Sequence, residues 1–278
     1  MYNIGWFSTG RGKSARALLK NAFASIEKGE VKAAIDFVFC SREPGESLET
    51  DKFISLVEGY RIPLVCFSYK KFRDGRTDDS KSGVLPQWRL EYDRQIIARL
   101  KGFHPDLCVL AGYMLIVGKE ICSSYNMINL HPAAPNGPAG IWQEVIWQLI
   151  EAKAKETGVM MHLVIPELDK GPVVSYCTFP ITGAPFDNHW QAIGGQEIAE
   201  IKERRGENNP LFKVIREHGF KREIPLILAS IKAFSRGNVS IQNGKVIDSQ
   251  GKVIGGYNLT NEINELVSNK PASLDNWS

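Results

Sequence analysis

The sequence predicts an open α/β fold, with a mostly parallel, twisted sheet and helices on both of its faces. Three observations predict it. Short apolar runs rich in β-branched and aromatic residues recur along the first half of the chain. Segments with the apolar spacing of amphipathic helices separate these runs. A glycine-containing loop joins the first run to the first helical segment. Strands that alternate with helices pair in parallel, because each helix carries the chain back across a face of the sheet.

The expected strands are the apolar runs of the first half, at residues 2–8, 34–40, 63–67, 107–110 and 127–130. Helices are expected between these strands, over residues 14–23, 49–60 and 90–100. In the second helical segment, Phe53, Ile54 and Val57 are spaced so that they would share one face of a helix. The other two segments repeat this spacing. Each expected helix is therefore amphipathic and has one face for the sheet.

The second half of the chain adds two strands and a hairpin. Apolar runs at residues 159–165 and 173–179 flank the loop 166–172, which proline and glycine bracket. Helical spacing returns over residues 226–234. The dipeptide Asn243-Gly244 then follows within an apolar run. It predicts a hairpin turn, because both residues accept positive φ.

The chain is expected to form one main domain. Residues 183–210 contain Gly194-Gly195 and lose the periodic apolar pattern, so we interpret them as an insertion or a mobile segment. After the hairpin, a short helix is expected at residues 261–267. The prediction is a domain over residues 1–250 with an insertion at about 183–210, and a C-terminal extension over residues 251–278.

Composition excludes several classes of protein. The 34 Lys and Arg residues exceed the 31 Asp and Glu residues by only three, too few to indicate a nucleic-acid partner. No apolar run approaches the ~18 residues of a membrane span, and the first residues lack the pattern of an export signal. We therefore expect a cytoplasmic protein. The five cysteines are widely spaced, which favours core packing over disulfides or a zinc site.

The loop after the first strand, Ser8-Thr9-Gly10-Arg11-Gly12-Lys13-Ser14, is suited to hold a phosphate. Backbone N–H groups and the helix dipole attract anions at the start of a helix. The loop also fits a Gly-x-Gly-x-x-Ala dinucleotide fingerprint that ends at Ala15. That fingerprint requires an acidic residue after the second strand, where this chain has Ser41-Arg42. A phosphate loop is therefore favoured, with a plain tight turn as the alternative.

Asn129 and His131 stand at the end of the strand expected at residues 127–130 and directly before Pro132. Because they are two residues apart in a strand, their side chains point to the same side. An amide can donate a hydrogen bond to an oxygen that gains negative charge, and an imidazole can do the same or carry a proton. From the strand pattern alone, Asn129 and His131 could equally be a catalytic pair or simply the polar end of a strand.

Motifs further along the chain support the catalytic interpretation. Asn129-Leu130-His131-Pro132, His162 and Asp169-Lys170-Gly171-Pro172 together resemble the signature of the folate-dependent formyltransferase family. The upstream segment 105–114 is similar to the strand and turn that precede the folate pocket in that family. The resemblance covers residues 1 to about 180. It implies a Rossmann-like formyltransferase fold.

The resemblance also implies an activity. It would be transfer of a formyl group from 10-formyltetrahydrofolate to the primary amine of a phosphorylated substrate. Glycinamide ribonucleotide of de novo purine biosynthesis is the expected acceptor. Asn129, His131 and Asp169 would be catalytic: the first two would donate to the oxyanion, and Asp169 would orient His131 and relay protons. His162 would support the site or pack in the core. No metal is required.

Binding residues follow from the same resemblance. The residues implied for the folate pocket are Met114, Leu115, Ile116, Val117, Ile165, Glu167 and Leu168. Those implied for the substrate phosphate are Gly10, Arg11, Gly12, Lys13 and Ser14. Lys221, Arg222 and Glu223 resemble the family's charged residues near the phosphate and ribose, with a solvated charge cluster as an equal alternative. Trp142, Gln143 and Trp147 would shape the amine pocket or pack beside it.

The expected partners are a folate and a small phosphorylated amine, without nucleic acid or membrane, and the chain is expected to be a monomer or a homodimer. Other acceptors remain open. An amino-sugar nucleotide would keep the chemistry, whereas an aminoacyl-tRNA would require a basic C-terminal domain that residues 238–278 do not offer. A non-catalytic nucleotide-binding relative and a dinucleotide-dependent oxidoreductase are the alternatives of other classes.

Overall fold

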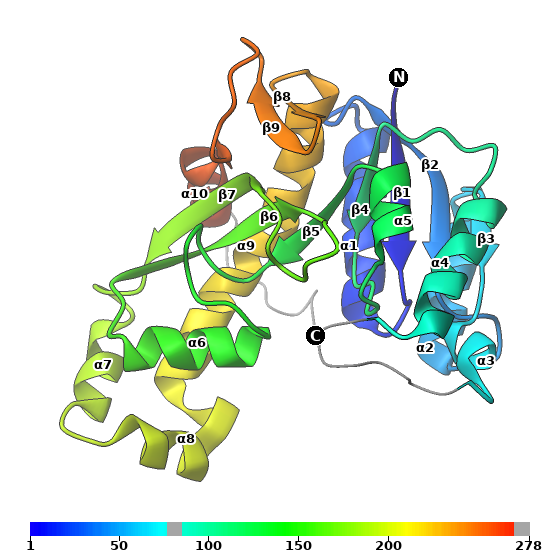
Figure 1. Ribbon diagram of the computed structural model, residues 1–278. Coiled ribbons are helices and arrows are strands. Elements are labelled where there is room, and N and C mark those ends of the chain that lie inside the picture. Colours follow the sequence, from blue (N-terminus) through cyan, green and yellow to red (C-terminus); the bar gives the residue numbers. More distant parts are fainter. Residues whose placement is uncertain (77–84, 270–278) are drawn as a thin grey trace.

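The computed structural model describes residues 1–76 and 85–269 and confirms the α/β fold (Figure 1). Within these residues, eight strands form one sheet in the order β10-β7-β6-β5-β4-β1-β2-β3. The strands are β1 (Tyr2–Ser8), β2 (Ala33–Cys40), β3 (Leu64–Cys66), β4 (Leu107–Leu110), β5 (Met127–His131), β6 (Glu156–Leu163), β7 (Val173–Pro180) and β10 (Tyr257–Asn258). Only β6 runs against its neighbours. The sheet is therefore mostly parallel, as the sequence predicts.

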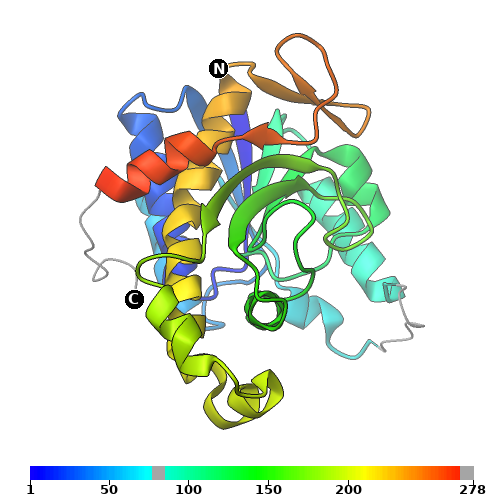
Figure 2. The ribbon, with the colours of Figure 1, turned by 90° about the vertical axis from the view of Figure 1, so that its left-hand side faces the viewer.

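Helices cover both faces of the sheet (Figure 2). One face carries α1 (Lys13–Glu27), α2 (Leu48–Gly59) and α9 (Pro210–Ser235), and the other carries α3 (Tyr69–Arg73), α4 (Gln87–Arg99) and α5 (Lys119–Ser124). The central strand β1 supplies both cores. Its Trp6 packs in the cluster with Leu19 of α1, while the next residue, Phe7, packs in the cluster with Tyr92 of α4. Successive side chains of a strand point to opposite faces, so one apolar strand serves two cores.

The strand order places two loops side by side. Strands β2 and β3 follow β1 on one side, and the next strand in sequence, β4, pairs with β1 on its other side. The loops that follow β1 and β4 therefore leave the sheet as neighbours at its carboxyl edge. Open α/β sheets bind ligands where the strand order reverses in this way.

The segment expected as an insertion or mobile piece is folded. It contains α7 (Asp187–Ile193), α8 (Ile198–Arg205) and a 3-10 turn (Gly206–Asn208). Phe186, Ile193 and Ile201 are buried in a third apolar cluster together with residues of α6 (Trp142–Glu151) and α9. The polar composition of this segment hid the few apolar residues that anchor it.

Helix α9 is longer than the sequence pattern indicates. Helical spacing was expected only from Leu226, but the helix begins at Pro210, where the side chain of Asn209 accepts a hydrogen bond from Phe212 N (3.2 Å). Pro225 lies inside the helix. Proline suits the first turn but interrupts the interior of a helix, which is why the earlier half was not expected. Lys221–Glu223 are consequently in the middle of a helix.

The hairpin and the residues after it complete the fold. Strands β8 (Val239–Gln242) and β9 (Lys245–Asp248) pair around Asn243 and Gly244, whose φ angles of 51° and 72° fit the predicted turn. The short strand β10, which was not expected, joins the sheet beside β7, and α10 (Thr260–Asn269) packs against α9 and β7. Residues 270–278 of the expected extension lie outside the described residues. No helix of the described ranges has the length and apolarity to cross a membrane.

Candidate active site

Three polar side chains share one face of the sheet at β5 and β6. Asn129 of β5 stands directly opposite His162 of the antiparallel strand β6. Directly opposed residues point to the same face, and His131, two residues after Asn129, joins them there. The imidazole centroids of His131 and His162 are 6.3 Å apart. The strand pairing thus assembles a polar cluster among the apolar residues of β5 and the second half of β6.

Asp169 reaches this cluster from the loop between β6 and β7. Its Oδ1 lies 3.5 Å from Nε2 of His162. Asp169 has a positive φ of 56°, a conformation that Asp tolerates better than most residues. The resemblance implied that Asp169 orients His131. In the structure the imidazole within 4 Å of Asp169 is that of His162, and the orientation of His131 by Asp169 stays a prediction.

Gly171 fixes the path of the same loop. A Cβ atom at this position would stand 1.6 Å from the carbonyl oxygen of Leu163, so the two backbone segments approach too closely for any side chain. Beside it, Leu163 N donates a hydrogen bond to Pro172 O (2.9 Å). The close approach closes the base of the loop and sets where Asp169 emerges.

In each histidine, one ring nitrogen faces a backbone carbonyl oxygen. Nδ1 of His162 is 3.1 Å from the carbonyl oxygen of Leu163, and Nε2 of His131 is 3.2 Å from that of Pro138. A carbonyl only accepts, so each of these ring nitrogens carries the hydrogen and donates. Burial lowers the pKa of His162 below its ordinary value, outweighing the Leu163 hydrogen bond and the charge of Asp169. His162 is therefore neutral, with a lone pair on Nε2.

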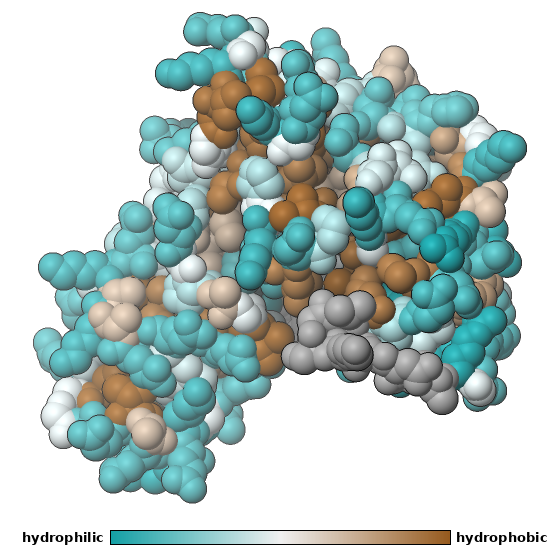
Figure 3. Space-filling model, viewed as in Figure 1, coloured by the Kyte–Doolittle hydropathy of each residue, from teal (hydrophilic) through white to brown (hydrophobic). Residues whose placement is uncertain are grey.

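The residues implied for a folate pocket lie in two loops next to this cluster. Met114 and Ile116, in the loop after β4, and Leu168, beside Asp169, are exposed apolar side chains. Val117 is buried, while Leu115 and Ile165 are partly buried and Glu167 is exposed. In the space-filling view, apolar side chains gather in the middle of the face, over β5, β6 and the loops beside them (Figure 3).

Cys122 of helix α5 is affected by charges from two elements. Burial raises the pKa of the Cys122 thiol to about 11, and the carboxylates of Asp93 and Glu167 add to the rise. Glu167, in the loop between β6 and β7, thus acts electrostatically on α5, which begins two residues after Val117. A surface of exposed apolar side chains is suited to a flat aromatic ligand.

The predicted phosphate loop has the expected local geometry. Gly10 has a positive φ of 60°, and Gly12 precedes α1 without a side-chain cap on the first turn of the helix. Arg11, Lys13 and Ser14 are exposed around this helix start. Backbone N–H groups and two basic side chains therefore surround the positive end of the helix dipole.

Thr9, which sequence reasoning did not single out, joins this loop to the loop after β4. Its N–H donates to Gly112 O (3.1 Å), and its hydroxyl oxygen accepts from Met114 N (3.0 Å) and from the Ser41 hydroxyl (3.0 Å). Thr9 is fully buried. Its position at the end of β1 was the available signal, since loops at that edge meet.

The charged residues of α9 have mostly structural partners. Arg222 is buried, donates to Asn264 Oδ1 (2.9 Å) and lies 4.2 Å above the ring of Phe179. Glu223 pairs with Arg216, whose guanidinium lies 4.8 Å from the centroid of Trp142. The structure thus ties Arg222 to α10 rather than directing it to a ligand.

Trp147 is also a packing residue, because it is buried against Phe212 at a centroid distance of 5.3 Å. Trp142 is instead partly exposed at the start of α6, and the guanidinium of Arg216 lies over its ring. Of the two tryptophans, only Trp142 is placed to shape a pocket. Gln143 is partly buried.

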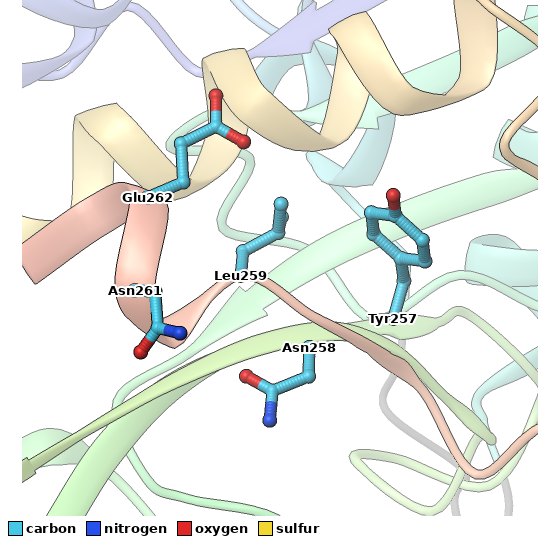
Figure 4. A pocket seen from close by; sticks show the side chains of 5 residues that line it. All are labelled: Tyr257, Asn258, Leu259, Asn261 and Glu262. Carbon is cyan, nitrogen blue, oxygen red and sulfur yellow. The ribbon is translucent and has the colours of Figure 1, made fainter.

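A hollow of about 380 Å³ lies elsewhere, on the surface of β10 and α10. Figure 4 shows that its side chains diverge: Asn258 and Asn261 point one way, and Tyr257 and Glu262 point the other. Ligand sites present converging polar groups, which this hollow does not. Within residues 1–76 and 85–269, His, Cys, Asp and Glu side chains nowhere gather in a group of three that could hold a metal ion.

The reversal of strand order and the polar cluster place a candidate active site at the carboxyl edge of an open α/β sheet. The chain belongs to the formyl transferase family, whose model matches residues 4–185. It is 34% identical to phosphoribosylglycinamide formyltransferase of Escherichia coli over 114 residues, which span 40% of this chain and 53% of the relative. It is 27% identical to the enzyme of that name from Dictyostelium discoideum over 190 residues, which span 65% and 84%.

A relative of another activity also matches. The chain is 27% identical over 126 residues to formyltetrahydrofolate deformylase of Haemophilus influenzae, covering 45% of this chain and 39% of the relative. Among solved structures, phosphoribosylglycinamide formyltransferase of Coxiella burnetii superposes with a TM-score of 0.64 at 20% identity, covering 92% of this chain and 98% of that one. Glycinamide ribonucleotide transformylase 1 of Symbiobacterium toebii superposes with 0.59 at 18%, covering 88% and 93%. These two likenesses establish the fold.

Proposed function

We propose that this protein transfers a formyl group from 10-formyltetrahydrofolate to the primary amine of a small phosphorylated substrate, with glycinamide ribonucleotide as the first candidate. The observation that carries the proposal is the cluster of Asn129, His131, His162 and Asp169 beside the two apolar loops. Relatives named for formyl transfer to phosphoribosylglycinamide, and for deformylation of formyltetrahydrofolate, support the donor.

The chemistry requires donors for an oxyanion. When an amine attacks the formyl carbon, the carbonyl oxygen gains negative charge, and the Asn129 amide and the His131 ring can donate hydrogen bonds to it. The Nε2–H of His131 points to Pro138 in the structure, in the loop that precedes α6. Movement of this loop upon acceptor binding would release that donor for the oxyanion.

Proton transfer is assigned to Asp169. The attacking nitrogen must lose a proton, and the leaving folate nitrogen must gain one. Asp169 is the carboxylate at the cluster and is about one quarter exposed, so it can exchange a proton with the bound reactants directly or through water. The site residues Asn129, His131 and Asp169 therefore keep their proposed catalytic roles.

The loop after β1 would hold the substrate phosphate. The first turn of α1 offers uncapped N–H groups, and Arg11 and Lys13 add positive charge beside them. This loop and the folate loop are joined through Thr9, so phosphate and folate would bind on adjacent parts of one site. Met114, Ile116 and Leu168 would contact the folate, and the backbone of residues 114–117, apart from the Met114 N–H that Thr9 holds, would pair with its polar edge.

The test is turnover with purified protein and 10-formyltetrahydrofolate. Three reactions are compared: with glycinamide ribonucleotide, with an amino-sugar nucleotide, and without an amine. Formylated product and free formate are both measured. Formylated product from glycinamide ribonucleotide supports the proposal. Formylated product from the amino-sugar nucleotide alone would show that the acceptor is an amino sugar instead. Formate without any formylated amine identifies a hydrolase, and no reaction in any arm overturns the function. Asp169→Asn serves as the inactive control.

A further inference from the structure

His162 combines burial with an unused acceptor. It is 3% exposed, and its Nδ1–H is committed to the Leu163 carbonyl. Its Nε2 is buried and has no hydrogen-bond partner within the part of the chain that the structure describes, although Oδ1 of Asp169 is 3.5 Å away. That separation is too long for a hydrogen bond. A buried polar atom without a partner requires a reason.

The reason is that both facing atoms are acceptors. An ionised carboxylate has no hydrogen to donate, and neither does Nε2 of a neutral imidazole whose hydrogen is on Nδ1. The two lone pairs therefore face each other across 3.5 Å. A proton on Asp169 would change this contact into an O–H···N hydrogen bond and would satisfy the buried nitrogen.

We propose that His162 is a positioning residue that accepts a hydrogen bond from Asp169 whenever Asp169 holds the proton that moves during formyl transfer. The inference rests on the proposed function and deepens it. The Leu163 carbonyl locks the tautomer, so that Nε2 faces Asp169 as an acceptor. His162 thus stabilises the protonated carboxyl group between its two proton transfers, and it also orients the hydroxyl hydrogen.

The step balances without an outside reagent. After the amine nitrogen bonds to the formyl carbon, its N–H bond breaks and an O–H bond forms on Asp169. That O–H donates to Nε2 of His162. The O–H bond then breaks as the same proton bonds to the folate nitrogen, the bond from the formyl carbon to that nitrogen breaks, and its electron pair stays with the leaving nitrogen. His162 is unchanged at the end.

The surroundings keep His162 in this role. Two titratable groups act on it: Asp169 from the loop, which favours the charged form, and His131 from β5, which disfavours it. Burial disfavours the charged form more strongly than either neighbour acts, so the pKa of His162 stays below its ordinary value. Nε2 consequently remains an acceptor at neutral pH.

Two substitutions separate this role from simple packing. The amide of His162→Asn can take the place of Nδ1 and keep the Leu163 contact, but it has no atom at the position of Nε2. The amide of His162→Gln can reach the position of Nε2. We expect kcat of His162→Asn to fall by about 10- to 100-fold, a part of the 100- to 10,000-fold that proton transfer typically supplies. KM values should stay within about twofold, and His162→Gln should recover a measurable part of kcat.

A stability cycle tests the same contact without turnover. Asp169→Asn places an N–H donor opposite Nε2, so it should raise the midpoint of thermal unfolding by about 2–4 °C. The same substitution in a His162→Asn background should give no rise. In addition, ¹⁵N spectra of the full-length protein should show His162 as the Nδ1–H tautomer at neutral pH.

Three results would overturn the inference: an Nε2–H tautomer or a charged ring for His162, an equal effect of Asp169→Asn in both backgrounds, or a fully active His162→Asn. These outcomes differ from failure of the proposed function. A wild-type protein that transfers no formyl group to any acceptor contradicts the function, whereas an active wild type with an unaffected His162→Asn contradicts only the role of His162.

Discussion

The hydroxyl oxygen of Thr9 lies 3.0 Å from the backbone nitrogen of Met114 and accepts its hydrogen bond. Through this contact the loop after β1 holds the loop after β4. The Ser41 hydroxyl, which follows β2, donates to the same oxygen (3.0 Å). The loops after β1, β2 and β4 are therefore hydrogen-bonded through one buried atom, Oγ1 of Thr9, which lies between the proposed phosphate site and the proposed folate site.

Replacing Thr9 by Val should weaken binding of both substrates. The substitution keeps the shape of the side chain but leaves Met114 N–H and the Ser41 hydroxyl without their acceptor, at a cost of about 1–3 kcal/mol for each buried group. We expect the KM values for the folate and for the phosphorylated amine to rise together by about 10-fold in steady-state assays. Thr9→Ser keeps the oxygen and should stay near wild type. A rise in only one KM would show that the two loops are not coupled through Thr9.

Replacing Gly171 by Ala should disturb both stability and activity. The added Cβ would stand 1.6 Å from Leu163 O, and because that atom belongs to the backbone, the loop must move. We expect the free energy of unfolding, measured by urea denaturation, to fall by about 2–4 kcal/mol. Turnover should fall further than stability explains, because Asp169 is displaced.

Gly59→Ala is the matched control for Gly171→Ala. A Cβ at Gly59 would meet no atom within 4 Å, and the residue ends helix α2, where Ala is favoured over Gly. Its stability should be unchanged or slightly higher. Equal stability of the two variants would contradict the close approach at Gly171.

The parts of the fold with a local pattern were predictable from the sequence. The turn at Asn243-Gly244 follows from the φ angles that these residues accept, and the strands of the first half follow from their apolar runs. Elements that depend on residues far away in the sequence could not be predicted in this way. The two-residue strand β10 exists because it pairs with β7, and α9 continues through Pro225 because its flanks are packed.

The candidate site was predictable in its residue types but not in its pairings. The types and spacing of Asn129 and His131 placed them together on one face, and the family resemblance added Asp169. The link between Asp169 and His162 depends on the register that sets His162 opposite Asn129, on the bulge between Met161 and His162, and on a positive φ. The family motif identified His162 as a supporting or core residue, but the sequence could not show that Asp169 faces its ring.

Asp93 should support the loop after β4, where the proposed folate site lies, as well as the core. Its carboxylate accepts from Arg89 Nη1 (2.6 Å) and from Gly118 N (2.6 Å), which follows directly after Val117. The Arg89 and Asp93 side chains are 3% and 1% exposed. Asp93→Ala would leave a buried charge unpaired, so we expect a loss of about 3–5 kcal/mol in the free energy of unfolding and a higher KM for the folate.

Two further variants separate the functions of Asp93. Asp93→Asn keeps an acceptor for Gly118 N and should preserve the KM for the folate better than Asp93→Ala does. The double variant Arg89→Met/Asp93→Leu removes both charges and should recover much of the lost stability, because an apolar pair avoids the desolvation of two ions. A double variant no more stable than Asp93→Ala would show that the ion pair itself is required.

His218 should make the stability of the protein fall as the solution is acidified. The ring packs on Phe186, with a centroid distance of 4.8 Å, and burial lowers the pKa of His218 to about 4, with Arg222 and Lys221 adding to the decrease. Its pKa in the unfolded chain is about 6.5. Between these values the unfolded chain binds the proton and the folded chain does not, so protonation favours unfolding. The stabilising contribution is complete above about pH 6.5 and is lost as the pH falls toward 4.

The measurement is the free energy of unfolding of wild type and of His218→Gln between pH 7.5 and 4. Gln does not titrate, so the stability of the wild type relative to the variant should decline across this window. The free energy of unfolding of both proteins should still fall somewhat as the pH is lowered, because the pKa of His162 is lowered in the folded chain as well. A difference between the two proteins that stays constant from pH 7.5 to 4 would mean that His218 takes up its proton equally well in the folded and unfolded chains, contrary to the burial of its ring against Phe186.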